Sequence, residues 1–115
     1  MIEAIKNYRE TLDFSGQWWF DEVSKYVITK YPELNFAFSY QRPMFKITKD
    51  IFLMLGGGKN HFSIYTTDFD YVNMVKDEKI KGLKFGKSAV LFPKDRIELL
   101  KRAHQMCDDI IHRNL

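Results

Sequence analysis

The chain contains very little cysteine, proline and glycine. Its 115 residues include one cysteine, three prolines and six glycines. A lone thiol, Cys107, excludes an internal disulfide and any metal cage built from several cysteines. No internal repeat, low-complexity tract or stretch resembling a linker interrupts the sequence, which favours one folded domain over residues 1–115.

Long hydrophobic runs are absent as well. No stretch approaches the roughly 20 apolar residues that a membrane span needs. The opening segment MIEAIKNYRETLDF also lacks the apolar centre of a signal peptide. We therefore expect a cytoplasmic protein with no membrane partner.

Neither sign of charge dominates the chain. Eighteen Lys and Arg residues stand against fifteen Asp and Glu, a formal net charge of +3, and the two signs are interleaved, as in Lys76-Asp77-Glu78-Lys79. Nucleic-acid binders usually gather their basic side chains on one face or arm. The pattern along the chain predicts a mixed, solvated surface and no nucleic-acid partner.

Aromatic residues, by contrast, are abundant. They make up 16% of the chain, and ten of them are phenylalanine. A single domain of this length buries a real core. So many rings predict broad packed surfaces, or an open face that stacks against a flat partner.

The periodicity of apolar residues predicts an α+β fold. Helices are expected over 2–12, from Trp18 to the residue before Pro32, over 69–76, and from Pro93-Lys94-Asp95 to the C-terminus. Strands are expected over 35–40, 44–48, 51–55, 60–66, 82–85 and 88–92, with breaks at 13–16 and at Pro43. Because the strands follow one another closely, we expect a largely antiparallel sheet of about five strands, covered by helices on one face.

The predicted C-terminal helix carries an apolar stripe. It consists of Ile97, Leu100, Ala103, Cys107, Ile110 and Ile111. A thiol on such a face is typical of an inert buried cysteine rather than a nucleophile. Ser63 and His61 share a strand face, but no glycine-flanked elbow or third partner accompanies them, so we expect no enzyme activity.

The stretch GGGKNHFSIYTT, residues 56–67, resembles a phosphate-binding loop at first sight. A Walker A loop requires Ser or Thr after its lysine and a helix thereafter, whereas Asn60 follows Lys59 and the next segment is a predicted strand. The glycines are therefore expected to supply positive φ angles for a hairpin or bulge between two strands.

Alternation along the strand after these glycines divides its side chains between two faces. Phe62 and Ile64 are predicted to point into the core. Opposite them a polar row is expected on the open face, made of Lys59, His61, Ser63 and Tyr65 and joined by Lys46 and Tyr40. This row is either an ordinary solvated surface or a shallow site for a small anionic or aromatic ligand, with Lys59 and His61 as donors.

Three segments carry a resemblance to a known family. YPELNFAFSYQRPMFKI, GGGKNHFSIY and GLKFGKSAVLFPKDRIELLKRA occur in the order and spacing of the YdhG-like family of small bacterial domains, over about residues 31–104. The chain departs from the family pattern at Gln41-Arg42-Pro43, where GMP is usual, and in its short entry to the last helix. The family resembles frataxin in fold, and some members have been called intracellular iron chaperones. The resemblance thus implies a frataxin-like fold and iron as a candidate ligand.

Two groups of residues bear on iron, which prefers carboxylate oxygen ligands. The carboxylates of the first third of the chain are Glu3, Glu10, Asp13, Asp21, Glu22 and Glu33, and they are interleaved with Lys and Arg. His104, Asp108 and His112 stand at helical spacing near Cys107, which places them along one side of the last helix. Each group also has an explanation without a metal. The carboxylates can form a solvated helix face, and His104 can pack beside the apolar stripe.

Three functions follow as hypotheses for a non-enzymatic binding domain. The first is iron binding or chaperoning, from the family resemblance. The second is binding of a small ligand on the open sheet face. The third is a protein-interaction or homodimerisation module that covers the aromatic face.

Overall fold

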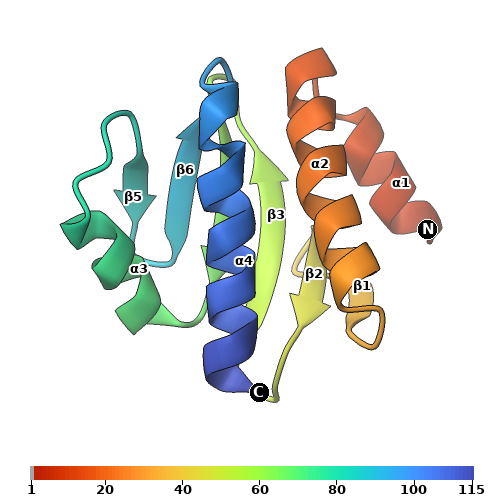
Figure 1. Cartoon of the computed structure of the whole chain (residues 1–115). Helices are drawn as coiled ribbons and strands as arrows, with labels where there is room; N and C mark the ends of the chain where they lie inside the picture. The colour runs from red at the N-terminus through yellow and green to blue at the C-terminus, as the bar shows by residue number, and fades with distance from the viewer. Residues whose placement is uncertain (1) are drawn as a thin grey trace.

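Within residues 2–115 the chain forms four α-helices and six strands, arranged as in Figure 1. The computed structural model describes residues 2–115. The helices are α1 (Glu3–Glu10), α2 (Phe14–Lys30), α3 (Phe69–Asp77) and α4 (Leu100–Asn114), the last preceded by a 3₁₀ turn, η1 (Ile97–Leu99). The strands are β1 (Asn35–Ser39), β2 (Arg42–Lys46), β3 (Phe52–Gly57), β4 (His61–Thr66), β5 (Lys84–Gly86) and β6 (Ala89–Pro93).

The strands form one sheet in the order β1-β2-β3-β4-β6-β5, and every neighbouring pair is antiparallel. Helices α2 and α4 pack side by side across one face, in front of the sheet in Figure 1, and leave the opposite face uncovered. The predicted α+β class with a largely antiparallel sheet is confirmed, with six strands instead of about five. No helix within residues 2–115 has the length and apolarity to span a membrane.

Aromatic stacking between helix and sheet forms the centre of the core. Trp19 of α2 is fully buried, with its ring centroid 6.0 Å from that of Phe62 and 5.8 Å from that of Phe92. Its indole N–H donates to the Lys94 carbonyl at 3.0 Å, which satisfies the one polar group of the side chain. The high aromatic content is therefore partly explained by this contact between α2, β4 and β6.

The apolar stripe of the last helix is largely as predicted. Ala103, Cys107, Ile110 and Ile111 are completely buried. Ile97, however, is 60% exposed, because residues 97–99 form a 3₁₀ turn and the α-helix begins only at Leu100. A 3₁₀ turn has three residues per turn instead of 3.6, so the phase of the stripe does not extend back to Ile97.

The predicted break at residues 13–16 is in fact the start of α2. The Asp13 carboxylate accepts a hydrogen bond from the Gly16 N–H at 2.8 Å and caps the helix. Helix α2 therefore begins at Phe14, four residues before the predicted start. Its end before Pro32 is as expected.

The predicted break at Pro43 is also wrong. Pro43 lies inside β2, opposite Phe38 of β1, and the ladder between β2 and β3 runs only from Met44 to Lys46. The N–H that proline lacks is therefore not needed for pairing with β3. The chain turns instead at Tyr40 and Gln41, which join β1 to β2 as a two-residue hairpin with φ angles of 52° and 61°.

The glycine stretch forms a hairpin, as predicted, but not by the predicted mechanism. Gly56 and Gly57 continue β3, and the turn to β4 is closed by the Gly58 N–H donating to the His61 carbonyl at 2.8 Å. In the described chain positive glycine φ occurs at Gly82 and not in this stretch. Gly57 packs closely against Leu12 instead, since a Cβ there would lie 2.8 Å from Leu12 Cδ2 and the leucine side chain would have to shift.

Candidate functional site

The strands of the uncovered face carry basic side chains and no acidic ones. None of the six strands contains Asp or Glu, and this holds for all strands of residues 2–115. The register places Lys46 of β2 opposite Phe52, and Lys84 of β5 opposite Leu91, on this face. Asp50 lies in the turn between β2 and β3 rather than on a strand. The acidic and basic residues that are mixed along the chain are therefore unevenly placed, because the strands contain only the basic ones.

Arg42 is the central cation of this face. Its guanidinium lies over the ring of Tyr65, with Cζ 4.5 Å from the ring centroid. Continuing the register of β2 and β3 by two residues places Arg42 opposite Gly56, whose missing side chain leaves room for both groups. A Cβ there would lie 3.0 Å from Tyr65 Cε2 and 3.2 Å from Arg42 Nε. Among residues 2–115 no carboxylate forms an ion pair with Arg42.

A shallow apolar hollow of about 350 Å³ lies on the lower part of the same face. Its walls are formed by Tyr40, Phe52, Met54, Thr66, Thr67, Phe69, Lys87 and Ser88. Tyr40 is 73% exposed and its ring stacks on that of Phe52 at 6.3 Å. At the other wall the Lys87 ammonium lies 5.6 Å from the ring centroid of Phe69. The hollow therefore combines exposed rings with a cation.

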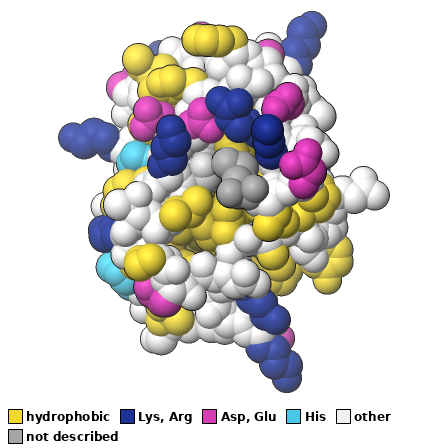
Figure 2. Space-filling model, turned by 90° about the vertical axis from the view of Figure 1, so that its right-hand side faces the viewer, with side chains coloured by type: hydrophobic (Ala, Val, Ile, Leu, Met, Phe, Trp, Pro, Cys, Tyr) yellow, Lys and Arg dark blue, Asp and Glu magenta, His cyan; other side chains and the backbone are white. Residues whose placement is uncertain are grey.

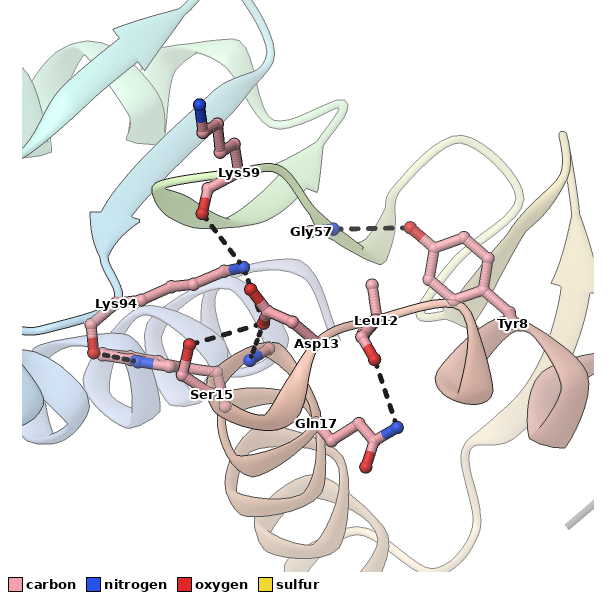
Figure 3. A network of polar contacts seen from close by, with 10 residues as sticks. Tyr8, Leu12, Asp13, Ser15, Gln17, Gly57, Lys59 and Lys94 are labelled. Atoms are coloured by element: carbon pink, nitrogen blue, oxygen red, sulfur yellow. Dashed lines mark hydrogen bonds and ion pairs between the residues drawn. The ribbon is translucent and has the colours of Figure 1, made fainter.

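A second hollow, of about 430 Å³, lies at the end of the sheet where β3 turns into β4. Lys59, Asn60 and His61 line it together with Ser15, Pro93, Lys94 and Asp95. Figure 3 shows the polar network beside it, in which Lys94 reaches between Asp13 and the main chain of Lys59 while the Lys59 side chain extends away from them.

Lys94 has a structural role in this network. Its side chain is only 8% exposed, and its ammonium donates to the Asp13 carboxylate at 2.9 Å and to the Lys59 carbonyl at 3.4 Å (Figure 3). These bonds join the start of α2, the β3–β4 turn and the end of β6. The same contact, with help from the Gly16 N–H, lowers the pKa of Asp13. Lys94 therefore neutralises Asp13 rather than offering a free charge to a ligand.

The six residues of the predicted polar row divide among three places. Lys46, Ser63 and Tyr65 lie on the open sheet face, as expected from alternation. His61 begins β4 on the same face, but together with Lys59 it lines the hollow at the sheet end. Tyr40 lies in the hairpin turn and reaches the face from there.

One feature of that row is corrected by the structure. Ser63 was expected to be exposed, yet it is only 6% exposed. It occupies a central strand between Gly56 and Leu91, and the longer Arg42 and Tyr65 side chains extend over its neighbour Gly56. Its short side chain lies below the surface that a ligand would contact. Phe62 and Ile64, by contrast, are fully buried as predicted.

His104, Asp108 and His112 of the last helix contact tyrosine side chains and do not point toward a common centre. The His104 ring stacks on Tyr26 at 4.0 Å, and its Nε2 lies 3.0 Å from the Glu22 carbonyl oxygen. Asp108 accepts hydrogen bonds from the hydroxyls of Tyr26 and Tyr31, both at 2.5 Å. Within residues 2–115 no group of three His, Cys, Asp or Glu side chains is arranged to hold a metal ion.

Asp108 stays ionised in this setting. Burial raises its pKa, but the hydrogen bonds from Tyr26, Tyr31 and Lys30 outweigh burial and leave the pKa below its ordinary value. The pKa of Tyr31 rises to about 12, mainly through burial and then through its bond to Asp108. Burial likewise raises the pKa of the Cys107 thiol to about 12. Cys107 is thus placed as an inert core thiol, as its sequence position suggests.

The acidic residues of the first helices are interleaved with bases. Figure 2 shows the side of the molecule that carries α1 and the N-terminus, where acidic and basic side chains alternate in a band above a hydrophobic area. Asp21 is one example, since Arg9 binds its two oxygens through Nε and Nη2, each at 2.7 Å. Asp13 is paired with Lys94 in the same way. These carboxylates neutralise cations of the same surface.

Arg42, Phe52, Met54, Phe69 and Lys87 belong to the site but were absent from the predicted row. The signal for Arg42 was present: accepting Pro43 as a strand residue puts Arg42, Met44 and Lys46 on one face by alternation. Phe69 and Lys87 come from α3 and the β5–β6 turn, and only the folded chain brings them together.

Comparison with known structures supports the fold. The chain aligns with the crystal structure of a DUF1801-family protein, YdhG, from Bacillus subtilis, with a TM-score of 0.69 over 91% of this chain and 88% of that one. The fold is YdhG-like. Sequence identity is 18%, so the likeness concerns the fold alone. No protein-family profile and no curated protein matches the sequence.

Proposed function

We propose that this YdhG-like domain is a non-enzymatic binding module whose open sheet face takes an anionic ligand with an apolar, ring-containing body. The observation that carries the proposal is Arg42, a guanidinium fixed on the ring of Tyr65 with no carboxylate partner in the described chain. A planar guanidinium held in this way presents its N–H groups for bidentate recognition of a carboxylate, sulfonate or phosphate.

The hollow beside Arg42 suits the rest of such a ligand. Tyr65, under the guanidinium, pairs with Met54, and Met54 lines the hollow of about 350 Å³. The exposed ring of Tyr40 and the rings of Phe52 and Phe69 offer stacking surfaces around it. A mostly apolar concavity with a few polar groups at its edge is typical of small-molecule sites.

Iron binding, which the family resemblance implies, receives less support. A ferrous or ferric ion calls for several oxygen ligands that converge. Asp13 and Asp21 instead pair with Lys94 and Arg9. The charged residues of the strands are all basic, so the sheet face supplies no set of carboxylate oxygens for iron.

Self-association through the open face is also disfavoured by charge. A symmetric dimer would place the same surface on both partners, so cations such as Arg42 and Lys84 would be enclosed in an interface whose strands supply no carboxylate to pair with them. Like charges directly opposed across an interface destabilise it. A ligand of opposite sign fits the face better than a second copy does.

The proposal can be tested with 8-anilinonaphthalene-1-sulfonate, an aromatic sulfonate whose fluorescence rises on binding. We expect saturable binding by the wild type and roughly tenfold or greater weakening in Arg42→Gln, since a hydrogen bond to a charged group contributes about 1.5–3 kcal/mol. Lys101→Gln, which removes an exposed cation from α4, is the matched control and should bind like the wild type. Equal affinity in all three proteins would refute the assignment of Arg42.

A further inference from the structure

The open sheet face has two properties that occur together in proteins that bind unpaired nucleic acid. It exposes aromatic rings around a hollow, and its strands carry cations without carboxylates. From these we infer that the ligand of the face is single-stranded nucleic acid, an inference that rests on the proposed function and narrows its ligand class. Proteins of this kind stack bases on aromatic side chains and place basic groups along the phosphate backbone.

The rings are placed so that bases can reach them. Tyr40 is 73% exposed and Phe69 is 43% exposed, and they lie on opposite walls of the hollow. Phe52, stacked against Tyr40, lies on the same wall as Tyr40. Every base has a flat face, so such a surface recognises bases with little regard to sequence.

The cations lie beside the rings rather than in a separate patch. Arg42 stacks on Tyr65 and Lys87 lies over Phe69. Lys84 adds a third positive charge on the same face, opposite Leu91. Among residues 2–115 none of these three cations forms an ion pair with a carboxylate. Each is therefore available to a phosphate.

Folding separates charges that are mixed along the chain. The sequence pattern predicted no nucleic-acid partner because Lys and Arg alternate with Asp and Glu. In the structure the carboxylates lie in helices and turns. Several of them form ion pairs with basic side chains, as Glu78 does with Arg102. Among charged residues the strands contain only basic ones. The alternation of basic and acidic residues, which argued against nucleic-acid binding in the sequence, is therefore absent from the strands of this face.

The shape of the site favours single strands over duplex. A base can stack on Tyr40 or Phe69 only when it is not already stacked and paired inside a helix. The hollow is shallow, and within residues 2–115 the helix that reaches it is α3, which lines it through its first residue, Phe69. Unpaired strands are the form whose bases are free.

Fluorescence anisotropy with labelled oligothymidylate of about twelve nucleotides tests the inference, with a duplex of equal length as the comparison. We expect the wild type to bind the single strand at least about tenfold more tightly than the duplex. With about three phosphates neutralised, the affinity should fall roughly a hundredfold for a tenfold rise in salt.

Two variants localise the binding. Arg42→Gln and Tyr40→Ala should each weaken oligothymidylate binding several-fold or more, while Lys101→Gln should leave it unchanged. Tyr40 lies in an exposed turn, so the loss of its ring spares the core.

The outcomes separate this inference from the proposed function. No binding of oligothymidylate at low salt, or equal affinity for duplex and single strand, would overturn the inference. If the anilinonaphthalene sulfonate still binds in an Arg42-dependent way, the proposed function stands without it. If neither probe depends on Arg42, both are wrong.

Discussion

At the scale of single residues, the arrangement of Arg42 over Tyr65 depends on the absence of a side chain at Gly56. The two groups approach within 3.2 Å and 3.0 Å of the position where a Cβ would be. Contacts this short force a neighbour to move, and here the neighbours are the two groups that form the site. The glycine would thus contribute to the proposed binding through packing, not through backbone freedom.

Gly56→Ala should therefore weaken binding of the anilinonaphthalene sulfonate, by several-fold, while the protein remains folded. Displacement of the guanidinium from the ring is the expected cause. Gly58→Ala is the control, because its added Cβ would meet nothing closer than the His61 carbonyl oxygen at 3.7 Å. Unchanged binding in Gly56→Ala would show that the pair tolerates the methyl group and that its geometry matters little.

Asp13 provides a prediction about pH. Its pKa is lowered in the folded protein, first by the hydrogen bond from Lys94 and then by the Gly16 N–H. A carboxyl whose pKa falls on folding stabilises the protein above its unfolded pKa of about 4, and this stability is lost as the pH falls below that value. This pH-dependent stabilisation requires the negative charge of Asp13. Asparagine at the same position has no charge but can still cap the helix.

Thermal unfolding at a series of pH values from 7 to 2 checks this. Asp13→Asn should melt below the wild type at neutral pH, and the two melting temperatures should converge as the pH drops below about 4. A constant difference across the whole range would mean that the charge of Asp13 does not contribute.

At the scale of elements, the β1–β2 hairpin contains backbone strain. Tyr40 and Gln41 both adopt positive φ, and a two-residue turn of this kind normally favours Asn-Gly. For residues other than glycine the left-handed conformation costs roughly 1–2 kcal/mol. The same turn places Tyr40 beside the hollow, so the backbone strain lies in an element of the candidate site.

Gln41→Gly should relieve part of this strain and raise the free energy of unfolding by about 1 kcal/mol. Urea denaturation monitored by tryptophan fluorescence measures it. Gln41→Ala, which keeps the Cβ, should show no gain. A gain of equal size in both variants would rule out backbone strain as the cause.

Helices α2 and α4 are joined by the half-buried carboxylate of Asp108. It accepts two tyrosine hydroxyls and lies 3.1 Å from the Lys30 ammonium. Asp108→Asn should lower the free energy of unfolding by about 1.5–3 kcal/mol, because bonds to a charged acceptor are lost. Asp77→Asn, on the exposed end of α3, should change it by less than about 0.5 kcal/mol. Equal effects would contradict a specific role for Asp108.

The same elements show what the sequence could predict. Period-two and helical patterns placed Phe62, Ile64 and Cys107 in the core because burial of one face is a local consequence of alternation. The start of α2 and the course of β2 were missed, since Asp13 was interpreted as a break and Pro43 as an interruption. The pairing of Lys87 with Phe69 depends on tertiary contacts alone. The sequence therefore predicted only those residues of the candidate site that follow from alternation along a single strand.

At the scale of the whole molecule, the main feature is that the strands carry cations without carboxylates, whereas the helices carry both signs of charge. Homodimerisation through the aromatic face was one hypothesis from the sequence, whereas cations without carboxylate partners disfavour pairing through this face. We expect light scattering at high protein concentration to give the mass of a monomer, near 13.7 kDa. A stable dimer that Lys84→Glu strengthens or breaks would show that the face is an interface between copies.

The most direct test of the central claim is to map where an anionic aromatic probe binds. In ¹H–¹⁵N correlation spectra of the protein titrated with the anilinonaphthalene sulfonate, we predict saturable shifts at amides of the open face and its rim, including Tyr40, Met54, Tyr65 and Lys87. The amides of α2 and α4 should change little. Shifts confined to the helical layer, or to the hollow around Lys59 and His61, would contradict a binding site on the open sheet face.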